Sequence, residues 1–415
     1  MRPPPLPRAA RCIYLDYQAT TPVWPEVAEA AIPFLTTHWG NPSSAHAYGR
    51  PCAHAVEKAR RSVSALLGAS PSEILFSSCG SEADNHAICG AVALVQTRAR
   101  AAGHTAHTPH VVTTNAEHPA VERCLAALQA EGRCSATFVP VDAEGRVGAQ
   151  AIVAALRPET ALVTVMHANN EVGSVNPIAE ICAAVHARSP ATLVHTDAAQ
   201  SVGKIEVHVK ELGVDMLTLV GHKIGAPKGV AALYVREGLE LPNLLHGGGQ
   251  ESGRRAGTES VVLLAALGRA CEIARDELVQ NAQHMEETRS RLAQLLTEGL
   301  GGGGADGLPG VRINGPANPS LRLPNTLSIG LRGVVASALL ERLSDRVAAS
   351  AGAACHSGEA SVSAVLRAMG VPLEYAIGTL RLSTGRHTTM DEVEEAAELI
   401  IGEAKRQKIE AAGTS

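Results

Sequence analysis

The sequence predicts an α/β protein whose main sheet is mostly parallel and is covered by helices on both faces. Two observations lead to this fold class. Short apolar runs alternate with segments of helical period through the middle of the chain, which is typical of strands joined by helical crossovers. The chain also has 415 residues, 45% of them hydrophobic, which is enough for a large core although only 2% are aromatic.

The apolar runs are each short enough to be single strands of this sheet, and amphipathic stretches lie between several of them. We assign strands to Glu73–Ser78, His110–Thr114, Thr137–Val141, Ala161–His167, Thr192–Thr196, Met216–Val220 and Val230–Val235. We expect Pro119–Ala130 and Pro177–Arg188 to be helices that cover the sheet. Ligands of open α/β sheets bind beyond the carboxyl ends of the strands, so the residues that follow these runs are candidate site residues.

The second part of the chain has a different pattern, with long helical stretches from about Val261 onward. A Gly-rich break at Gly301–Gly307 is interpreted as a surface loop, because no strand leads into it. A strand at Asn325–Leu331, a helix at Val335–Ser344 and a closing helix at Asp391–Ile409 are expected after it. We therefore predict a large domain over residues 12–262, whose first ~25 residues pack with the other domain, and a small α+β domain over residues 263–410.

Charge and cysteine content argue against several classes of protein. The net charge is −5 and no basic stripe is visible, so a nucleic-acid partner is not expected. No apolar stretch approaches the ~20 residues that span a bilayer. The nine cysteines include no CxxC pair and no spacing typical of zinc sites, which favours a reducing compartment. Met1–Arg11 lacks the apolar core of a secretion signal, so we expect a cytoplasmic protein, with a short organellar address as the alternative.

Three polar segments follow predicted strands. Gly80 and Ser81 come between a strand and a helix, where free backbone N–H groups can hold a phosphate, although a simple turn and cap has the same sequence pattern. His118 is either a helix cap or a ring that stacks on a flat cofactor and moves protons. Asn169 and Asn170 belong either to a turn or to a set of hydrogen-bond donors to a cofactor.

Asp197 and Lys223 give the strongest local signal, because each ends an apolar strand where a lone charge is costly. The simplest interpretation is an ion pair between them. The functional alternative gives them separate roles: a desolvated lysine is a nucleophilic amine that can form a Schiff base, and a carboxylate can keep a pyridine nitrogen protonated. A nucleotide P-loop is excluded, because Lys228 is followed by Gly229 and not by Ser or Thr.

Cys355 differs from the other cysteines, because it lies in a run of small residues, Ala348–Gly358, that we predict to be a mobile loop. Most solitary cysteines are small buried hydrophobic residues. Cys355 is instead flanked by His356 and Ser357, and an accessible thiol beside a histidine is a candidate nucleophile.

These segments occur together with other motifs in a specific order. The motifs are YLDYQATTP, GNPSSAH, EHPAV, HANNEVG, HTDAAQSVGK, GHK, GGGQESGRRAGTES, RLPNT and RLSTGR. In this order they closely resemble the class V aminotransferase superfamily, in its branch of cysteine desulfurases and selenocysteine lyases. The resemblance runs from about Ile13 to Thr389, nearly the whole chain.

The resemblance implies the fold of aspartate-aminotransferase-like enzymes that depend on pyridoxal phosphate, working as homodimers, with the cofactor bound by the large domain. It implies that Lys223 forms the Schiff base with the cofactor and that Asp197 contacts the pyridine nitrogen. The remaining cofactor contacts that it implies are His118 on the ring, Asn170 and Gln200 around the ring and its phenolic oxygen, and Gly80, Ser81, His222 and Thr258 of the partner subunit at the phosphate.

The resemblance also assigns the substrate-handling residues. Arg381, together with Asn41, would bind the carboxylate of an amino-acid substrate, and Cys355 would take the sulfur or selenium from it. Lys223 and His118 would move the α-proton. Two departures from the family pattern affect the cofactor pocket: Val220 replaces a Ser or Thr before Gly-His-Lys, and Gly225-Ala226 replaces Tyr-Gly after it.

The substrate preference is inferred from three features of the resemblance. The chain ends at Ser415 without the long extension with which some desulfurases bind scaffold proteins, and Val220 and the sequence Gly352–Ser357 are more similar to selenocysteine lyases. The main prediction is therefore selenocysteine lyase, which gives L-alanine and selenide, with an acceptor protein for the selenium or sulfur. Cysteine desulfurase, which gives L-alanine and an enzyme persulfide, is the alternative. An aminotransferase of this fold and a non-catalytic scaffold are further alternatives, and retention of Lys223 and Cys355 argues against both.

Overall fold

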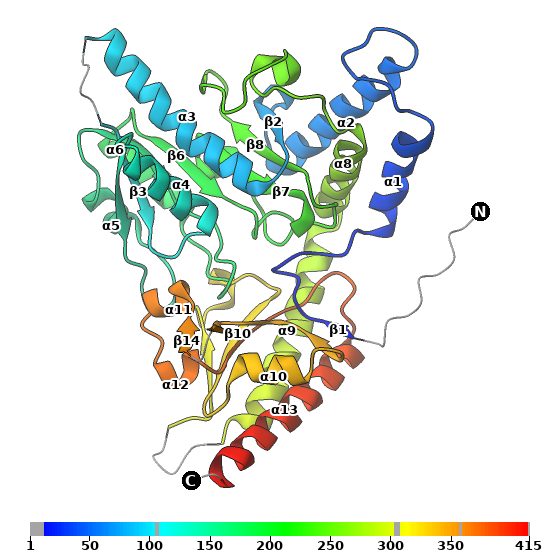
Figure 1. Ribbon diagram of the computed structural model, residues 1–415, viewed down its shortest axis with the longest axis vertical. Coiled ribbons are helices and arrows are strands. Elements are labelled where there is room, and N and C mark those ends of the chain that lie inside the picture. Colours follow the sequence, from blue (N-terminus) through cyan, green and yellow to red (C-terminus); the bar gives the residue numbers. More distant parts are fainter. Residues whose placement is uncertain (1–11, 104–107, 303–307, 357–358, 414–415) are drawn as a thin grey trace.

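The structure is a computed structural model that describes residues 12–103, 108–302, 308–356 and 359–413. Figure 1 shows a large sheet enclosed by helices, with a smaller sheet below it that packs on the long helices α9 (Leu278–Leu300) and α13 (Met390–Gly413). The side chain of Cys355 lies outside the described part of the structure.

The main sheet contains seven strands in the order β2-β8-β7-β6-β5-β3-β4. Their bounds are β2 (Ile74–Ser77), β3 (His110–Thr114), β4 (Ser135–Val139), β5 (Thr160–Thr164), β6 (Leu193–Asp197), β7 (Met216–Val220) and β8 (Ala231–Val235). Only β8 is antiparallel to its neighbours in this sheet, and all other adjacent pairs are parallel. The predicted α/β class with a mostly parallel sheet is thus confirmed.

Helices cover both faces of this sheet. Successive strand residues point to opposite sides, so each face packs in its own apolar cluster. Met216 on β7 packs in one apolar cluster with α3 (Gly80–Ala101) and α4 (Pro119–Ala130). Leu217, the next residue, packs in a second cluster with the helices of the other face. Those helices are α1 (Pro25–Thr36), α2 (Gly49–Leu67), α6 (Ile178–Arg188) and α8 (Val261–Asp276). Such two-sided burial explains why the strands are continuously apolar.

The smaller sheet is antiparallel and has the strand order β12-β15-β10-β9. Its strands are β9 (Val311–Asn314), β10 (Thr326–Leu331), β12 (Ser350–Ala351) and β15 (Thr379–Ser383), and α10 (Ala336–Arg342) packs beside them with α9 and α13. The start of the chain joins this part, because β1 (Ile13–Tyr14) pairs in parallel with β11 (Val347–Ala348). Ile13 and Leu15 are buried in the same apolar cluster.

The connection between the two sheets runs through α8 and α9, which follow one another almost without a break. The predicted domain division between residues 262 and 263 falls inside α8. Leu264, Leu267 and Ala270 of α8 are buried in the cluster of the large sheet, whereas Leu292 and Leu296 of α9 are buried in that of the small sheet. The packing partners therefore change near Glu277, and the division into two domains stays a prediction.

The segment Ala348–Gly358 was predicted as a loop; residues 348–356 are instead largely extended, and residues 357–358 lie outside the described part of the structure. β13 (Ala353–His356) pairs antiparallel with β14 (Glu359–Val362), and Cys355 lies opposite Ala360 in this pair. The prediction rested on the shortage of large side chains, but strand pairing is made by backbone groups that every residue here has. Short helices α11 (Ala364–Ala368) and α12 (Leu373–Ala376) follow, and α5 (Ala149–Ala154) and α7 (Val209–Leu212) lie beside the large sheet.

Within the described residues, every helix is too short or too polar to cross a lipid bilayer.

Candidate active site

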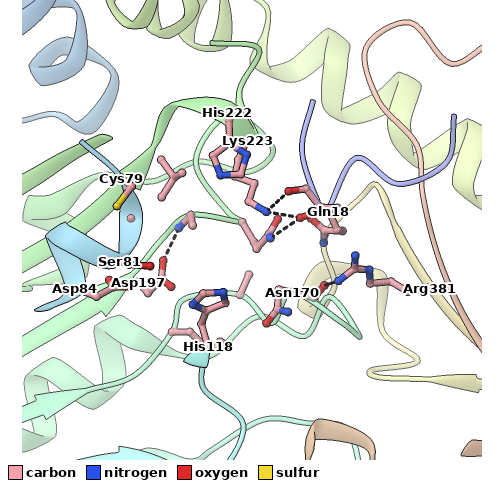
Figure 2. A pocket seen from close by; sticks show the side chains of 17 residues that line it. Gln18, Cys79, Ser81, Asp84, His118, Asn170, Asp197, His222, Lys223 and Arg381 are labelled. Atoms are coloured by element: carbon pink, nitrogen blue, oxygen red, sulfur yellow. Dashed lines mark hydrogen bonds between the residues drawn. The ribbon is translucent and has the colours of Figure 1, made fainter. Parts of the chain in front are cut away.

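A cavity of about 360 Å³ lies beyond the carboxyl ends of β6 and β7, where α3 and α4 begin (Figure 2). It is lined by Gln18, Ala19, Cys79, Gly80, Ser81, Asp84, His118, Met166, Ala168, Asn170, Asp197, Ala199, Gln200, Val220, His222, Lys223 and Arg381. This is the edge at which open α/β sheets bind their ligands. The structure thus brings together nine of the residues that the sequence singled out.

Lys223 ends a single helical turn, Gly221–Lys223, that directly follows β7. Its Nζ donates hydrogen bonds to the carbonyl oxygen of Ala19, at 2.9 Å, and to that of Gln18. Burial, and secondarily the charge of Arg381, lowers the pKa of the Lys223 amine to about 8. The group is therefore close to being a neutral nucleophile at physiological pH.

Asp197 is the last residue of β6 and is buried. Its Oδ1 accepts a hydrogen bond of 2.9 Å from the backbone N–H of Ala199, which fixes the carboxylate at the cavity wall. Burial raises the pKa of Asp197, while the nearby His118 and Lys223 act in the opposite direction. The simple Asp197–Lys223 ion pair does not form, since the Lys223 amine donates to backbone carbonyls of the N-terminal segment.

Asp84 is a second buried carboxyl group in this cavity, only 2% exposed, and it comes from the second turn of α3. Burial and the adjacent charge of Asp197 raise the pKa of Asp84 well above its usual value. Its Oδ1 has no hydrogen-bond partner among the described residues. His195 Nε2 lies 3.8 Å from this Oδ1, and burial lowers the pKa of His195 to about 3, so the neighbouring ring brings no positive charge to Asp84.

The N-terminus of α3 opens into the cavity. Its N-cap residue Cys79 is extended, with φ −165° and ψ 168°, and makes no side-chain cap, so first-turn N–H groups at Gly80 and Ser81 face the cavity uncapped. A Cβ atom on Gly80 would lie 2.7 Å from Cγ2 of Val220, so only glycine fits. The free amides and the helix dipole make this end suitable for an anion such as a phosphate.

His118 is the N-cap of α4 and enters the cavity from the wall opposite Lys223 (Figure 2). Its Nδ1 accepts a hydrogen bond of 3.1 Å from the N–H of Ala120, so the neutral ring carries its hydrogen on Nε2. The preceding Glu117 is buried and accepts hydrogen bonds from Thr114 Oγ1 at 2.7 Å and from the N–H of Met166 at 3.0 Å. These contacts hold the start of α4 against the end of β5.

Arg381 on β15 brings a positive charge to the cavity from the small sheet. Its Nη2 donates to Asp16 Oδ1 at 3.0 Å and to Ser350 Oγ at 2.9 Å, and its Nη1 donates to the carbonyl oxygen of Asn170 at 3.4 Å. Its buried Nε has no partner among the described residues. The guanidinium can therefore still receive a carboxylate.

Gln200 and His222 complete the walls of the cavity. The Nε2 of Gln200 donates to the carbonyl oxygen of Gln18 at 3.1 Å, and its Oε1 is buried without a partner among the described residues. His222 Nδ1 lies 3.1 Å from Thr20 Oγ1, and burial, followed by the charge of Lys223, lowers the pKa of the ring to about 4. His222 is thus neutral and can act only as a hydrogen-bonding group.

Three of the predicted site residues are not among those that line the cavity. Asn41 is exposed on the loop before α2, where its Oδ1 accepts a hydrogen bond from the N–H of Ser43. Thr258 is also exposed and lines a separate hollow beside Ser78. Cys355 is placed only by its backbone, on β13. The roles predicted for all three remain predictions.

Sequence reasoning missed Gln18 and Asp84. Gln18 lies in the motif YLDYQATTP, and the local sequence carried no signal for it, because contacts with residues far along the chain place it in the cavity. Asp84 follows Gly80 by four residues, one helical turn, so it lies on the same face of α3, and that spacing was the available signal.

The donor set fits a pyridine ring that carries a phosphate and an aldehyde. The N-terminus of α3 suits the phosphate, Asp197 suits the ring nitrogen and the amine of Lys223 suits the aldehyde. The buried Gln200 Oε1 marks polar space that the protein itself leaves unfilled among the described residues. Fold and site together define an enzyme that depends on pyridoxal phosphate.

Comparisons with known proteins identify its family. The family model described as aminotransferase class-V matches residues 13–396, and the chain belongs to that family. A cysteine desulfurase of Trichormus azollae is 43% identical over 94% of this chain and 92% of its own length. The cysteine desulfurase IscS of Clostridium botulinum strain Hall is 38% identical over 94% of this chain and 93% of its own length. A solved NifS-like protein has a TM-score of 0.84 and 35% identity, covering 94% of this chain and 98% of its own. The predicted family, enzyme class and cofactor are confirmed.

Proposed function

We propose that this protein is a cysteine desulfurase, which removes the sulfur atom of L-cysteine and leaves L-alanine. The observation that carries the proposal is a cavity that contains an amine, a buried carboxylate and a guanidinium whose Nε has no partner among the described residues, in a chain 43% identical to a cysteine desulfurase. The sequence alone favoured selenocysteine as the substrate. The names of the relatives described above favour cysteine, which was the alternative.

Lys223 is the proposed attachment point of the cofactor and, once released, the base that takes the α-proton of the substrate. The cofactor supplies an electron sink for the negative charge that develops next to its ring. The pKa of about 8 suits Lys223 for both tasks, since the amine can lose and regain a proton near neutral pH. His118 lies on the opposite wall with Nε2–H available, so it can return a proton to the substrate.

The remaining cavity residues are proposed to bind the cofactor and the substrate carboxylate. Gly80, Ser81 and His222 hold the phosphate, Asp197 the ring nitrogen, and Asn170 and Gln200 the rest of the ring. Arg381 binds the substrate carboxylate through Nε and Nη, assisted by Asn41. The Asp16–Arg381 ion pair holds the guanidinium in place before the substrate arrives.

Cys355 is the proposed sulfur acceptor. Its thiolate attacks the sulfur of the bound substrate, the substrate C–S bond breaks and an S–S bond forms, so Cys355 becomes a persulfide. The electron pair of the broken bond stays with the amino-acid carbon, which takes a proton and becomes the methyl group of alanine. The persulfide sulfur then passes to an acceptor protein.

The proposed enzyme is a homodimer with shared active sites. Thr258 is exposed within the polar segment Gly247–Ser260 and lies outside the cavity of its own chain. The proposal therefore assigns Thr258 to the phosphate site of the partner subunit. We also propose that the enzyme works in the cytoplasm.

A direct substrate assay tests the proposed function. The purified protein, supplied with pyridoxal phosphate and with dithiothreitol to reduce the persulfide and release its outer sulfur as sulfide, is incubated with L-cysteine or L-selenocysteine, and alanine, sulfide and selenide are measured. Alanine and sulfide in equal amounts from cysteine support the proposal. Turnover of selenocysteine alone would identify a selenocysteine lyase. Amino-group transfer to an added keto acid without alanine formation would identify an aminotransferase, and absence of any turnover would identify a scaffold.

The variant Cys355→Ala separates the desulfurase from the other activities. It should retain the cofactor but lose release of sulfide from cysteine, because the sulfur then has no acceptor. The loss for selenocysteine should be at least about tenfold smaller, equivalent to ~1.4 kcal/mol, since a selenol is the better leaving group. Unchanged cysteine turnover would contradict the proposed covalent step.

A further inference from the structure

Helices α3 and α4 run side by side in the same direction; two of the following contacts connect them directly, and the one to Arg133 joins α3 to the turn after α4. Asn85 Nδ2 donates to the carbonyl oxygen of Ala120 at 3.1 Å, and Gln96 Nε2 donates to that of Arg133 at 2.9 Å. Between these contacts, the sulfur atoms of Cys89 and Cys124 lie 3.8 Å apart. The thiols therefore face each other across the seam between the two helices, and neither belongs to the proposed active site.

The surroundings of this pair suit a dithiol and not a metal. Cys124 is buried in the apolar cluster between the sheet and the two helices, and Cys89 packs at the edge of that cluster and is partly exposed. Within the described residues, no group of three His, Cys, Asp or Glu side chains could hold a metal ion. One thiol is thus open to small reagents and the other is protected from them.

We propose that Cys89 and Cys124 form a reversible disulfide that joins α3 to α4. A disulfide has an S–S distance of about 2.0 Å, so the two sulfur atoms must approach by roughly 1.8 Å. Rotation about the side-chain bonds supplies movement of this size, and the hydrogen bonds on either side keep the helices in register.

The reaction needs a two-electron oxidant, for which a low-molecular-weight disulfide suffices. The Cys89 thiolate attacks one sulfur of the reagent, forms a mixed disulfide and releases one thiolate. Cys124 then loses its proton and attacks the sulfur of Cys89, which closes the internal disulfide and releases the second half of the reagent. Two cysteine thiols are oxidised and one small disulfide is reduced to two thiols.

The electrostatics of the pair give the two thiols these separate roles. Either thiol can donate in the contact between Cys89 and Cys124, and this contact, with the charge of Arg133, lowers the pKa of Cys89 although burial acts in the opposite direction. The same contact, together with burial, raises the pKa of Cys124. Cys89 is also the thiol that is partly exposed, whereas Cys124 is buried, so we assign Cys89 as the attacking thiolate and Cys124 as the resolving thiol.

The cross-link would act on the active site through the helices. Gly80 and Ser81 lie at the N-terminus of α3, and His118 is the N-cap of α4. A covalent bond between Cys89 and Cys124 fixes the distance between these two helix ends. The proposal does not depend on which amino acid the enzyme uses as its substrate.

The experiment treats the holoenzyme with oxidised glutathione and maps its peptides without reduction. We expect one linked pair of peptides that contains Cys89 and Cys124, a loss of two free thiols, and full reversal by dithiothreitol. Cys89→Ser and Cys124→Ser should each lose the cross-link. Cys271→Ser, which removes a solitary buried thiol, is the matched control and should keep it.

Cys134 provides the decisive comparison, because it is the other cysteine in the same apolar cluster. Cys134→Ser should form the Cys89–Cys124 cross-link as the wild-type protein does. A linkage of Cys89 to Cys134, or formation of stable mixed disulfides without an internal bond, would overturn the proposal. Each single variant is checked by its circular dichroism spectrum, so that a misfolded variant is not mistaken for one that lacks the cross-link.

Discussion

The residues of the cavity meet two different requirements. An amine must lose its proton readily, and two carboxyl groups must be buried close together in the same small space. Lys223 meets the first requirement by burial, since its pKa is lowered to about 8. The second requirement concerns Asp84 and Asp197: burial raises the pKa of both, and the charge of Asp197 raises that of Asp84 further. The chemistry of the site thus depends on desolvation as much as on the identity of its residues.

Lys223→Ala tests the assignment of the amine. The variant should not hold the cofactor covalently, and its turnover should fall below about a tenth of the wild-type rate. Each tenfold loss of rate corresponds to ~1.4 kcal/mol of activation free energy. Borohydride should fix the cofactor to the peptide that contains Lys223 in the wild-type protein only. Lys210→Ala, an exposed lysine on α7, is the control. A cofactor still fixed in Lys223→Ala protein would show that another amine is used.

Glu117 makes the stability depend on pH. Burial raises the pKa of Glu117 to about 8, whereas the unfolded chain has the ordinary value of 4.5. Between these values the folded state binds the additional proton, so this contribution to stability is complete below pH 4.5 and is lost as the pH rises through 8.

The variant Glu117→Gln should therefore weaken this dependence, because the amide cannot titrate. Its free energy of unfolding, measured in urea at several values between pH 5 and 9, is expected to fall less steeply with pH than that of the wild-type protein, by about 1 kcal/mol or more. Parallel curves for the two proteins would show that Glu117 is ionised in the folded state.

At the scale of the elements, the turn after Lys223 depends on one glycine. Gly225 has φ +82°, and a Cβ on it would lie 2.1 Å from Cδ2 of Trp24. The turn is also held by the Gly225 N–H, which donates to Thr21 Oγ1 at 2.9 Å. This contact gives a physical account of the departure from the family pattern at Gly225, since the ring of Trp24 occupies the space that a larger side chain would need.

Gly225→Ala should therefore destabilise the protein more than a glycine replacement in open space does. Gly132→Ala is the matched control, because Gly132 has φ +67° and nothing within 4 Å. Gly132→Ala should lower the free energy of unfolding by about 1 kcal/mol because of the backbone conformation. Gly225→Ala should lower it by a further ~1–3 kcal/mol because of overpacking. Urea denaturation midpoints measure both, and equal losses would mean that Trp24 moves aside freely.

The elements also show how far the sequence could predict the site. Asp197, Lys223 and Gly80 were predictable because a parallel sheet brings the ends of its strands to one edge. Gln18 was not, because its place depends on partners far along the chain, such as Ser383 Oγ, which accepts from its N–H at 2.9 Å. The strands β12 and β13 were missed because small residues give no periodic signal, even where their backbones pair.

At the scale of the whole molecule, a complete active site is expected to need two chains. Co-expression of Lys223→Ala and Thr258→Ala chains with different tags allows the mixed dimer to be purified. One of its two sites should combine an intact Lys223 with Thr258 of the partner subunit, so its activity should be about half that of the wild-type dimer. At limiting cofactor, both parent dimers should be much less active. A fully active monomer, or a mixed dimer no better than its parents, would contradict shared sites.

The pairing of β1 with β11 has a consequence for the order in which the protein is made. Ile13 pairs with Val347, and the N–H of Ser383 donates to the carbonyl oxygen of Leu15. The segment around Ile13 thus finds its partners only after the residues between it and Val347 have been synthesised, roughly 20–70 s later at ~5–20 residues per second. Because Gln18 and Ala19 follow this segment and hold the amine of Lys223, the cavity cannot be completed during translation of the large sheet. A nascent chain that stops before residue 347 therefore has no finished site in which to bind the cofactor.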